Sequence, residues 1–326
     1  MRILRRDDVK ELLTPEAALR LMREAFQALA KGDTSMPPRT YIGVERHRGE
    51  LGFMPAYVES MDSLGMKAVA LYLDNPPKFQ LPTIVGSMLL LDPESGRTLA
   101  LMDAGPITAV RTAAVSALAT DFLARKDSAV AGFLGAGVQA RSHAIALKEV
   151  RPIRRILAYS RTLSKTEKFA RWAARELDLE ADAVPTAKEV VAQSDIVTTA
   201  TPATSPILEG LWIQDGTHLN VIGSGLALEV DGATYARTAK VVVDHLDYCL
   251  GEARDIIAYS KDGTIAPEEI YSELGDLALG LRRGRENPEE ITLFRSIGLA
   301  IEDVASAKHV YDLAILEDRG LEVEFP

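Results

Sequence analysis

Lys67 is a cation that the sequence pattern places on an apolar face. If residues 65–73 form a strand, Lys67 shares its core-facing side with Val69, Leu71 and Leu73. A lysine on such a face is rare, and burial lowers the pKa of its ammonium group. Lys67 is therefore a candidate for binding a carboxylate and for transferring a proton near neutral pH. The alternative is a lysine that protects an edge strand from pairing.

Arg111 presents the same problem on a helix. Ile107 and Val115 lie one turn away on either side, and a guanidinium among apolar side chains is costly unless it is paired. It could clamp a substrate carboxylate or a cofactor phosphate, or it could pair with a structural acid. Arg39 alone is typical of a surface residue, but together with Lys67 and Arg111 it could form a cationic pocket for a small acid.

A glycine-rich turn lies within residues 128–140. An apolar run of strand character precedes Gly135 and Gly137, and a helical pattern starts around a third small residue, Ala140. This G-x-G-x-x-A spacing is typical of a dinucleotide-binding turn, in which the glycines allow a tight bend and the close approach of a pyrophosphate. The N–H groups at the helix N-terminus would face the phosphates. An ordinary strand–helix turn is the alternative.

The end of the strand expected at 154–160 helps to decide whether the cofactor is NAD or NADP. Folds that bind NAD place an acid here for the ribose 2′-hydroxyl, but this chain has Ser160, Arg161 and Thr162. These side chains could hold a 2′-phosphate, so we expect NADPH to be preferred over NADH. A solvated loop is the alternative.

Two more strand ends are expected at the same edge of the sheet. Thr201 follows one strand, and Val221, Gly223 and Ser224 end the next. Ligands of doubly wound sheets bind outside the carboxyl ends of the strands, so we expect these residues to contact the nicotinamide half of a cofactor. The five histidines form no metal-binding pattern, and Cys249 is interpreted as a small buried hydrophobe; no metal is expected.

Two kinds of scaffold must position these residues. From Pro37 to about residue 102 the hydrophobic period is two, which predicts a mainly antiparallel sheet. Beyond residue 125 strands and helices alternate, which predicts a parallel doubly wound sheet. The fold class is therefore α/β, with a Rossmann domain at 121–290 and a mainly antiparallel α+β domain at 1–120 plus 291–326. Strands are expected at 39–44, 52–58, 65–73, 83–91, 97–102, 129–134, 154–160, 196–200, 218–222 and 240–243. The main helices are expected at 7–31, 106–124, 139–149, 164–177, 186–192 and 298–318, and the first of these segments has a new helix start at residues 14–16.

Composition excludes some classes of partner. The 326 residues are 47% hydrophobic, enough for large cores, and carry a formal net charge of −10, which disfavours a nucleic-acid partner or an anionic membrane. No run of 18 apolar residues suggests a membrane span. We expect a cytoplasmic protein.

Several segments together resemble the ornithine cyclodeaminase and mu-crystallin family. They are spread over nearly the whole chain, and the ones around Arg111 and near the C-terminus are the most specific. The matching segments are MPPR at 36–39, MPA at 54–56, GMK at 65–67, LPT at 81–83, ITAVRTAA at 107–114, GAGVQA at 135–140, TATP at 199–202 and TLFRSIGLAIED at 292–303.

The resemblance implies a homodimer of two-domain subunits, in which the antiparallel domain binds the substrate and forms the dimer contact. Family members transfer a hydride between a nicotinamide and a carbon that bears nitrogen; they include cyclodeaminases, alanine dehydrogenases and ketimine reductases. By position, Arg39, Lys67 and Arg111 would bind the substrate carboxylate. The residues that would contact the cofactor are Thr83, Val138, Gln139, Thr201, Ser224 and Ser296.

One position departs from the family pattern. Cyclodeaminases and the alanine dehydrogenases carry an aspartate just after the glycine-rich end of the fifth strand, with a role in proton transfer at the substrate nitrogen. This chain has Gly225 there, and Glu229 or Asp231 could substitute only after a shift of the loop.

Cyclodeamination needs proton transfer at several steps, whereas reduction of a preformed imine needs less. We therefore expect an imine or ketimine reductase, or a reductive aminase, that acts on small 2-imino or 2-amino acids with NADPH. The alternatives are an alanine dehydrogenase or an ornithine or lysine cyclodeaminase, and a non-catalytic cofactor- or ligand-binding protein of the crystallin type.

Overall fold

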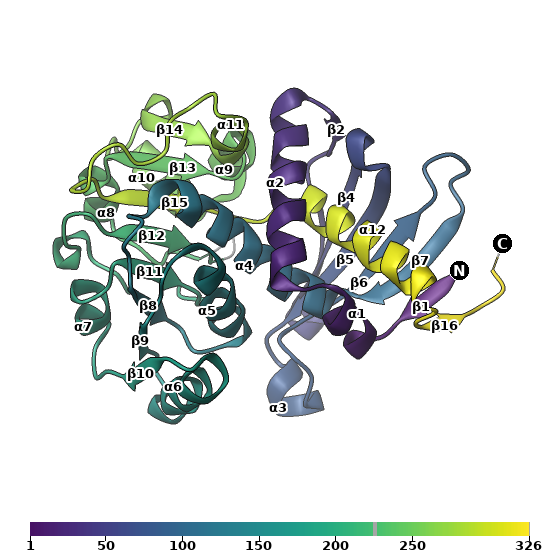
Figure 1. Ribbon diagram of the computed structural model, residues 1–326, viewed down its shortest axis with the longest axis horizontal. Coiled ribbons are helices and arrows are strands. Elements are labelled where there is room, and N and C mark those ends of the chain that lie inside the picture. Colours follow the sequence, from purple (N-terminus) through teal and green to yellow (C-terminus); the bar gives the residue numbers. More distant parts are fainter. Residues whose placement is uncertain (224–226, 326) are drawn as a thin grey trace. The chain divides into compact units, whose positions relative to one another are not determined.

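The computed structural model describes residues 1–223 and 227–325. Backbone contacts divide the chain into two compact units, Met1–Arg111 with Leu299–Pro326, and Thr112–Gly298 (Figure 1). The chain passes from the first unit to the second inside helix α4 (Ala104–Leu123) and returns just before helix α12 (Ala300–Leu316). The sequence predicts the two changes at about residues 120 and 290.

The first unit contains an eight-stranded sheet with the order β16-β1-β7-β6-β5-β4-β2, in which β3 also pairs with β4. Only the β1–β7 pair is parallel, so the sheet is mainly antiparallel as predicted. The strands are β1 (Arg2–Leu4), β2 (Thr34–Ser35), β3 (Thr40–Val44), β4 (Gly49–Val58), β5 (Ser63–Tyr72), β6 (Ile84–Leu91), β7 (Thr98–Asp103) and β16 (Leu321–Glu322).

Helices cover one face of this sheet. Helix α12 packs on β4 and β5 and also contacts helix α2 (Pro15–Lys31) (Figure 1). The segment predicted as helical at 7–31, with a new helix start at residues 14–16, forms two helices, α1 (Arg6–Leu12) and α2. The Thr14 side chain accepts a hydrogen bond from Ala17 N and caps the start of α2, so the predicted start is confirmed. A short helix α3 (Asn75–Phe79) joins β5 to β6.

The second unit contains an eight-stranded sheet in which every pair is parallel, with the order β10-β9-β8-β11-β12-β15-β13-β14. Strand order reverses between β8 and β11, the switch point of a doubly wound fold. The strands are β8 (Val130–Leu134), β9 (Arg155–Tyr159), β10 (Glu180–Ala183), β11 (Ile196–Thr199), β12 (His218–Val221), β13 (Lys240–Val243), β14 (Ile270–Glu273) and β15 (Thr292–Arg295).

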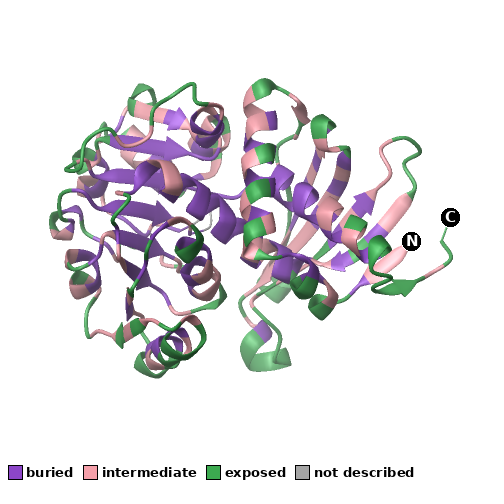
Figure 2. Cartoon of the chain, in the orientation of Figure 1, coloured by how far each residue is buried: buried purple, intermediate pink, exposed green. Residues whose placement is uncertain are grey.

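The sheet of the second unit is buried on both faces (Figure 2). Consecutive residues of one strand, such as Phe133 and Leu134, belong to two different apolar clusters, as the alternation of side chains along a strand requires. The helices of this unit are α5 (Val138–Val150), α6 (Leu163–Leu177), α7 (Ala187–Ala192), α8 (Gly232–Arg237), α9 (Leu246–Glu252), α10 (Arg254–Lys261) and α11 (Leu274–Leu279).

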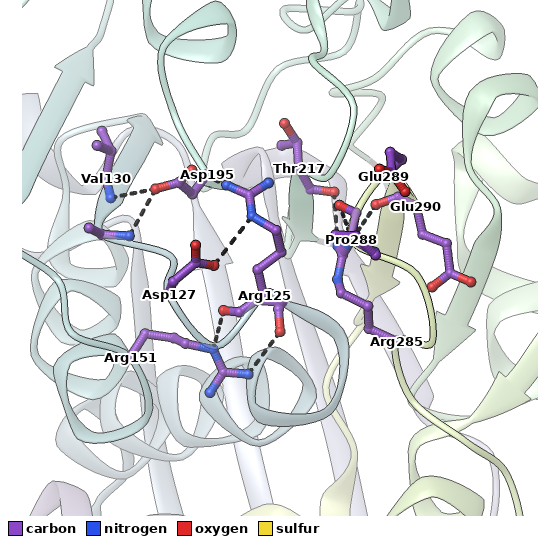
Figure 3. Close-up of polar contacts among 12 residues, drawn as sticks. Arg125, Asp127, Val130, Arg151, Asp195, Thr217, Arg285, Pro288, Glu289 and Glu290 are labelled. Atoms are coloured by element: carbon purple, nitrogen blue, oxygen red, sulfur yellow. Dashed lines mark hydrogen bonds and ion pairs between the residues drawn. The ribbon is translucent and has the colours of Figure 1, made fainter.

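Side chains at the amino end of this sheet tie its loops together (Figure 3). Asp195 accepts the N–H groups of Ala129 and Val130 and forms an ion pair with Arg125. Arg285, in the segment before β15, donates its Nε–H to the carbonyl oxygen of Leu123 at 2.7 Å. These contacts fix the start of β8 and the approach to β15.

The sequence did not predict β1, β2, β10, β14, β15 or β16. All of these strands are only two to four residues long, which is too short for an alternating pattern to stand out. Strand β15 is the most consequential omission, because it lies between β12 and β13 in the centre of the parallel sheet. Among the described residues, no helix is long and apolar enough to cross a bilayer.

Candidate functional site

Lys67 lies in the middle of β5, with Met54 of β4 and Met88 of β6 as its cross-strand partners. Its side chain is 2% exposed, and its Nζ atom is 2.6 Å from Oδ2 of Asp303 in the first turn of α12. The prediction of a buried lysine is confirmed, and it excludes the edge-strand alternative because β5 is paired on both sides.

The prediction that Lys67 shares a buried face along the whole strand is wrong. Val69 and Leu71 are only half-buried, and Leu73 lies beyond the end of β5 and is 54% exposed. The first half of β5 contacts α12: Ser63 Oγ donates to the carbonyl oxygen of Val304 at 2.6 Å, and Lys67 pairs with Asp303.

Arg111 is buried on α4 and pairs with two neighbouring acids of α12. Its Nε atom is 3.1 Å from Oδ1 of Asp303, and its Nη1 atom forms an ion pair with Oε2 of Glu302. The second carboxylate oxygen of Glu302 accepts the N–H of Leu299 at 2.7 Å, which caps α12. We call Lys67, Arg111, Glu302 and Asp303 the charge quartet.

Sequence reasoning missed both acids of the charge quartet, although it quoted the segment that contains them. The signal was available: Glu302 and Asp303 follow directly on an apolar segment and are themselves fully buried. Two consecutive acids in the first turn of a buried helix call for cationic partners from elsewhere in the chain.

The two cations of the quartet respond differently to burial. Burial lowers the pKa of Lys67 to about 8, although the nearby Asp303 carboxylate raises it. Burial also works to lower the pKa of Arg111, but the carboxylates of Asp303 and Glu302 outweigh it and raise that pKa. Lys67 is thus the member that can exchange a proton near neutral pH, while Arg111 stays charged.

Arg39 and Thr83 flank other strands of the same unit. Arg39 directly precedes β3 and is half-buried. Thr83 precedes β6 and is half-buried, and its carbonyl oxygen accepts the N–H of Tyr72 at 2.8 Å. Substrate binding by Arg39 and cofactor binding by Thr83 stay predictions.

The glycine-rich turn has the geometry that a pyrophosphate site requires. Gly135 has φ +116°, and a Cβ atom there would lie 2.5 Å from the carbonyl oxygen of Ala200. Gly137 is the N-cap of α5, and a Cβ atom there would meet nothing within 4 Å, so the space beside it is open. Ala140 is fully buried, which allows helix and strand to pack closely. The residues present therefore fit a dinucleotide.

The other residues predicted to contact the cofactor around this turn are exposed or half-buried. Val138 is 68% exposed at the first position of α5, and Gln139 is half-buried beside it. In the loop after β9, Ser160 Oγ forms a 2.7 Å hydrogen bond with Thr166 Oγ1, while Arg161 is exposed. Thr162, the N-cap of α6, is also exposed, and its carbonyl oxygen accepts a hydrogen bond from Ser160.

Glu229 binds the carboxyl ends of β11 and β12 together. One carboxylate oxygen accepts the N–H and the hydroxyl of Thr201, both at 2.7 Å; the other accepts the Thr199 hydroxyl and the Gly223 N–H, both at 2.8 Å. Burial raises the pKa of Glu229, although the hydrogen bonds from Thr201 and Thr199 oppose the rise. Both oxygens of Glu229 are engaged with these strand ends.

Asp231 is also engaged in hydrogen bonds within the fold. Its Oδ1 atom accepts the N–H and hydroxyl of Thr234, which caps α8, and the N–H of Gly210. The structure therefore does not support either Glu229 or Asp231 as a replacement for the aspartate of the family pattern. Ser224 and Gly225 lie outside the described residues.

Ser296 follows β15 and is almost fully buried. Its hydroxyl donates to Oδ2 of Asp244 at 2.9 Å, and the same oxygen accepts the N–H groups of Ile297 and Gly298. Val221 is buried at the end of β12, and its carbonyl oxygen accepts the Ser296 N–H. Asp244, which sequence reasoning missed, thus shapes the turn that carries Ser296. Contacts of Thr201, Val221, Gly223 and Ser296 with a cofactor stay predictions.

Comparison with known proteins agrees with this arrangement. The model of the ornithine cyclodeaminase/mu-crystallin family matches residues 1–317. The chain belongs to that family. Within it, the ketimine reductase mu-crystallin of Macropus fuliginosus is 36% identical over 95% of this chain and 96% of its own length.

Two solved structures of family members superimpose over almost the whole chain. The Thermococcus litoralis Delta(1)-pyrroline-2-carboxylate reductase, in complex with NADH and L-proline, is 42% identical with a TM-score of 0.96, and the match covers 99% of this chain and 100% of that one. An archaeal alanine dehydrogenase dimer with bound NAD is 36% identical with a TM-score of 0.93, covering 100% and 99% of the two chains. These likenesses confirm the predicted family and the predicted fold.

Proposed function

We propose that this chain is a nicotinamide-dependent reductase of small 2-imino acids, cyclic ketimines included, that also runs reductive amination of 2-oxo acids. The observation that carries the proposal is the charge quartet: a buried ammonium and a buried guanidinium held side by side by one carboxylate. The relatives that reduce a ketimine or pyrroline-2-carboxylate support the same reaction.

Each cation has a distinct task in this reaction. A bound dihydronicotinamide supplies a hydride, and the imine nitrogen must carry a proton to accept it at the neighbouring carbon. Lys67, with its pKa lowered by burial to about 8, holds a proton near neutral pH and can supply it at that nitrogen. Arg111 stays charged and binds the substrate carboxylate, with Arg39 as a further cation for the same group.

The cyclodeaminase and the alanine dehydrogenase are the second candidate. Both activities in this family use an aspartate that the chain replaces with Gly225. Glu229 and Asp231, the two acids next in line, are engaged by hydrogen bonds from the backbone and from threonine hydroxyls. This favours reduction of an imine over cyclodeamination.

The cofactor preference is a finer part of the proposal. We expect NADPH to bind better than NADH, because the loop after β9 carries Ser160, Arg161 and Thr162 in place of an acid, and Arg161 is exposed and able to reach a 2′-phosphate. The glycine turn at 135–137 and the N-terminus of α5 would hold the pyrophosphate.

A homodimer is the proposed assembly. The face of the first unit's sheet opposite α12 carries a row of half-buried or exposed apolar residues across five strands: Pro55, Met66, Leu89, Leu101 and Ile3. An apolar row of this width is typical of an interface rather than a solvated sheet face. A second copy of the chain is the occupant that we propose, in line with the dimeric archaeal relative.

A substrate panel tests the proposed activity. Purified protein is mixed with NADPH or NADH and with pyrroline-2-carboxylate, with pyruvate plus ammonia, or with pyruvate plus methylamine, and cofactor oxidation is followed at 340 nm. We expect turnover of the cyclic imine. Ammonia release from ornithine or lysine without imine reduction would instead support the cyclodeaminase, and no turnover with any substrate would leave the non-catalytic binding protein.

A further inference from the structure

The roles given to Lys67 and Arg111 in the proposed reaction leave the two buried acids of the charge quartet without an assigned task. Asp303 and Glu302 are both 0% exposed, and they follow one another in the first turn of α12. Carboxylates are rarely found fully buried unless they are paired. The two acids contact the cations differently: Asp303 contacts both Lys67 and Arg111, whereas Glu302 pairs with Arg111.

Asp303 contacts both cations at once. Oδ2 lies 2.6 Å from Lys67 Nζ, and Oδ1 lies 3.1 Å from Arg111 Nε. A single rigid carboxylate therefore sets the separation between an ammonium on β5 and a guanidinium on α4. Lysine has a flexible four-carbon stem, so an anchor of this kind decides where its ammonium points.

Glu302 contacts Arg111 and the backbone of its own helix start. Oε2 pairs with Arg111 Nη1, and Oε1 accepts the Leu299 N–H. Its influence on the ammonium is correspondingly smaller: the Asp303 carboxylate acts on the pKa of Lys67 through both charge and a hydrogen bond, and Glu302 through charge alone.

We propose that Asp303 is a positioning residue of the reaction, which orients the Lys67 ammonium and keeps it protonated, whereas Glu302 holds Arg111 and the start of α12. The proposal rests on the proposed imine reduction. The groups that face Lys67 are Asp303 and Glu302 from α12 and Arg111 from α4. Burial and the Arg111 charge both favour the neutral amine, and Asp303 is the principal group that opposes them.

The charge on Asp303 therefore has a kinetic consequence. If Lys67 must be protonated to supply the imine proton, activity is lost as the pH rises through the pKa of Lys67. Removing the Asp303 charge lowers that pKa further, so the loss begins at a lower pH. A residue with a purely structural role would reduce activity at every pH without moving this limb of the profile.

Asp303→Asn and Glu302→Gln form a matched pair, because each replaces a buried carboxylate by its amide at adjacent positions of one helix. Steady-state kcat and KM are measured between pH 6 and 10. We expect the alkaline limb of Asp303→Asn to move down by about one pH unit or more, with kcat at pH 9 reduced about tenfold. For Glu302→Gln we expect a clearly smaller shift of the limb, since Glu302 acts on Lys67 through charge alone, and a higher substrate KM. An unmoved limb in Asp303→Asn, or equal shifts in both variants, would overturn the proposal.

Two further measurements separate this proposal from folding defects and from the proposed function. If Asp303→Asn fails to fold, Asp303→Glu keeps the charge and misplaces it. In that variant kcat should fall while the limb stays in place; a limb that moves contradicts the proposal.

The pKa of Lys67 is also followed by NMR in protein labelled with ¹³C at the lysine Cε, and the signal is assigned with Lys67→Met. A lower pKa in Asp303→Asn would support the assignment even if the wild-type protein reduced no imine, and an unchanged pKa would overturn it.

Discussion

At the scale of single residues, the proposed chemistry depends on a lysine whose environment stabilises neither protonation state fully. Desolvation and the neighbouring guanidinium of Arg111 favour the neutral amine, whereas Asp303 favours the ammonium. The resulting pKa of about 8 lies close to the pH at which the protein would work, where a general acid is most effective. Arg111 shares the same carboxylate and still stays charged.

Lys67→Met tests this role directly. It keeps the aliphatic stem and removes the charge, so we expect kcat for imine reduction to fall by a factor on the order of 10² to 10⁴, the usual range for a lost acid–base group. Lys67→Arg should not restore activity, because a guanidinium does not deprotonate in this pH range. Near-wild-type kcat in Lys67→Met would leave this lysine without a catalytic role.

Arg111→Lys is the companion variant. It keeps a positive charge but loses the planar fork that binds a carboxylate through two hydrogen bonds. We expect a rise in substrate KM with a smaller effect on kcat. A large loss of kcat at unchanged KM would indicate that Arg111 takes part in the chemical step instead.

The exposed Arg161 governs the predicted cofactor preference. We expect wild-type protein to favour NADPH over NADH in kcat/KM by at least about tenfold, the equivalent of roughly 1.4 kcal/mol. Arg161→Ala should lose most of that preference while keeping its activity with NADH. A wild-type preference for NADH would show that the loop after β9 does not bind a 2′-phosphate.

At the scale of elements, the glycine turn between β8 and α5 combines two different requirements. Gly135 is needed by the fold, since its φ of +116° is disfavoured for other residues and Ala200 leaves no room for a side chain. Gly137 has φ −93° and open space where its Cβ atom would be, so the fold itself tolerates a side chain there.

Gly135→Ala and Gly137→Ala separate these requirements. We expect Gly135→Ala to lower the melting temperature of the protein in the absence of cofactor. Gly137→Ala should fold like the wild type but raise the Kd for NADPH, because its methyl group occupies the approach of the pyrophosphate. Thermal unfolding and fluorescence titration measure the two effects. Unchanged cofactor affinity in Gly137→Ala would argue against a pyrophosphate at this turn.

Two buried carboxylates hold the loops that follow strands of the parallel sheet. Glu229 and Asp244 each accept several hydrogen bonds from segments that follow β11, β12 or β15. Both carboxylates are buried within the unit and have their acceptor capacity used by the chain itself. They hold the candidate cofactor edge in shape, which is a different task from moving protons at a substrate.

At the scale of the whole molecule, the proposed assembly rests on the open face of the antiparallel sheet. Leu101, in the middle of β7, is 37% exposed, and its cross-strand neighbour Leu89 is half-buried. We expect Leu101→Glu to weaken the dimer, because it places a charge in the apolar row. Light scattering coupled to size-exclusion chromatography measures the mass.

The control for this experiment is Leu316→Glu. Leu316 is the last residue of α12 and 80% exposed, so a charge there should leave the assembly unchanged. A wild-type protein that elutes as a monomer, or a Leu101→Glu protein that remains a full dimer, would contradict the proposed interface.

Much of the architecture follows from the sequence alone, since it depends on local patterns. The change from a period of two to an alternation of strands and helices predicts the two kinds of sheet, and the spacing of Gly135, Gly137 and Ala140 predicts the turn between β8 and α5. The burial of Lys67 and Arg111 is also predictable, because each lies among apolar neighbours at strand or helix spacing.

Only the tertiary structure decided what those cations meet. Asp303 lies 236 positions after Lys67 and 192 after Arg111 in the chain, and no periodicity relates residues at such separations. The pairing exists because α12 returns to pack on β4 and β5, which carries its first turn onto the buried face of the sheet. The same reason explains Glu229: its sequence position permits a proton shuttle, but the folded strand ends of β11 and β12 surround it with donors.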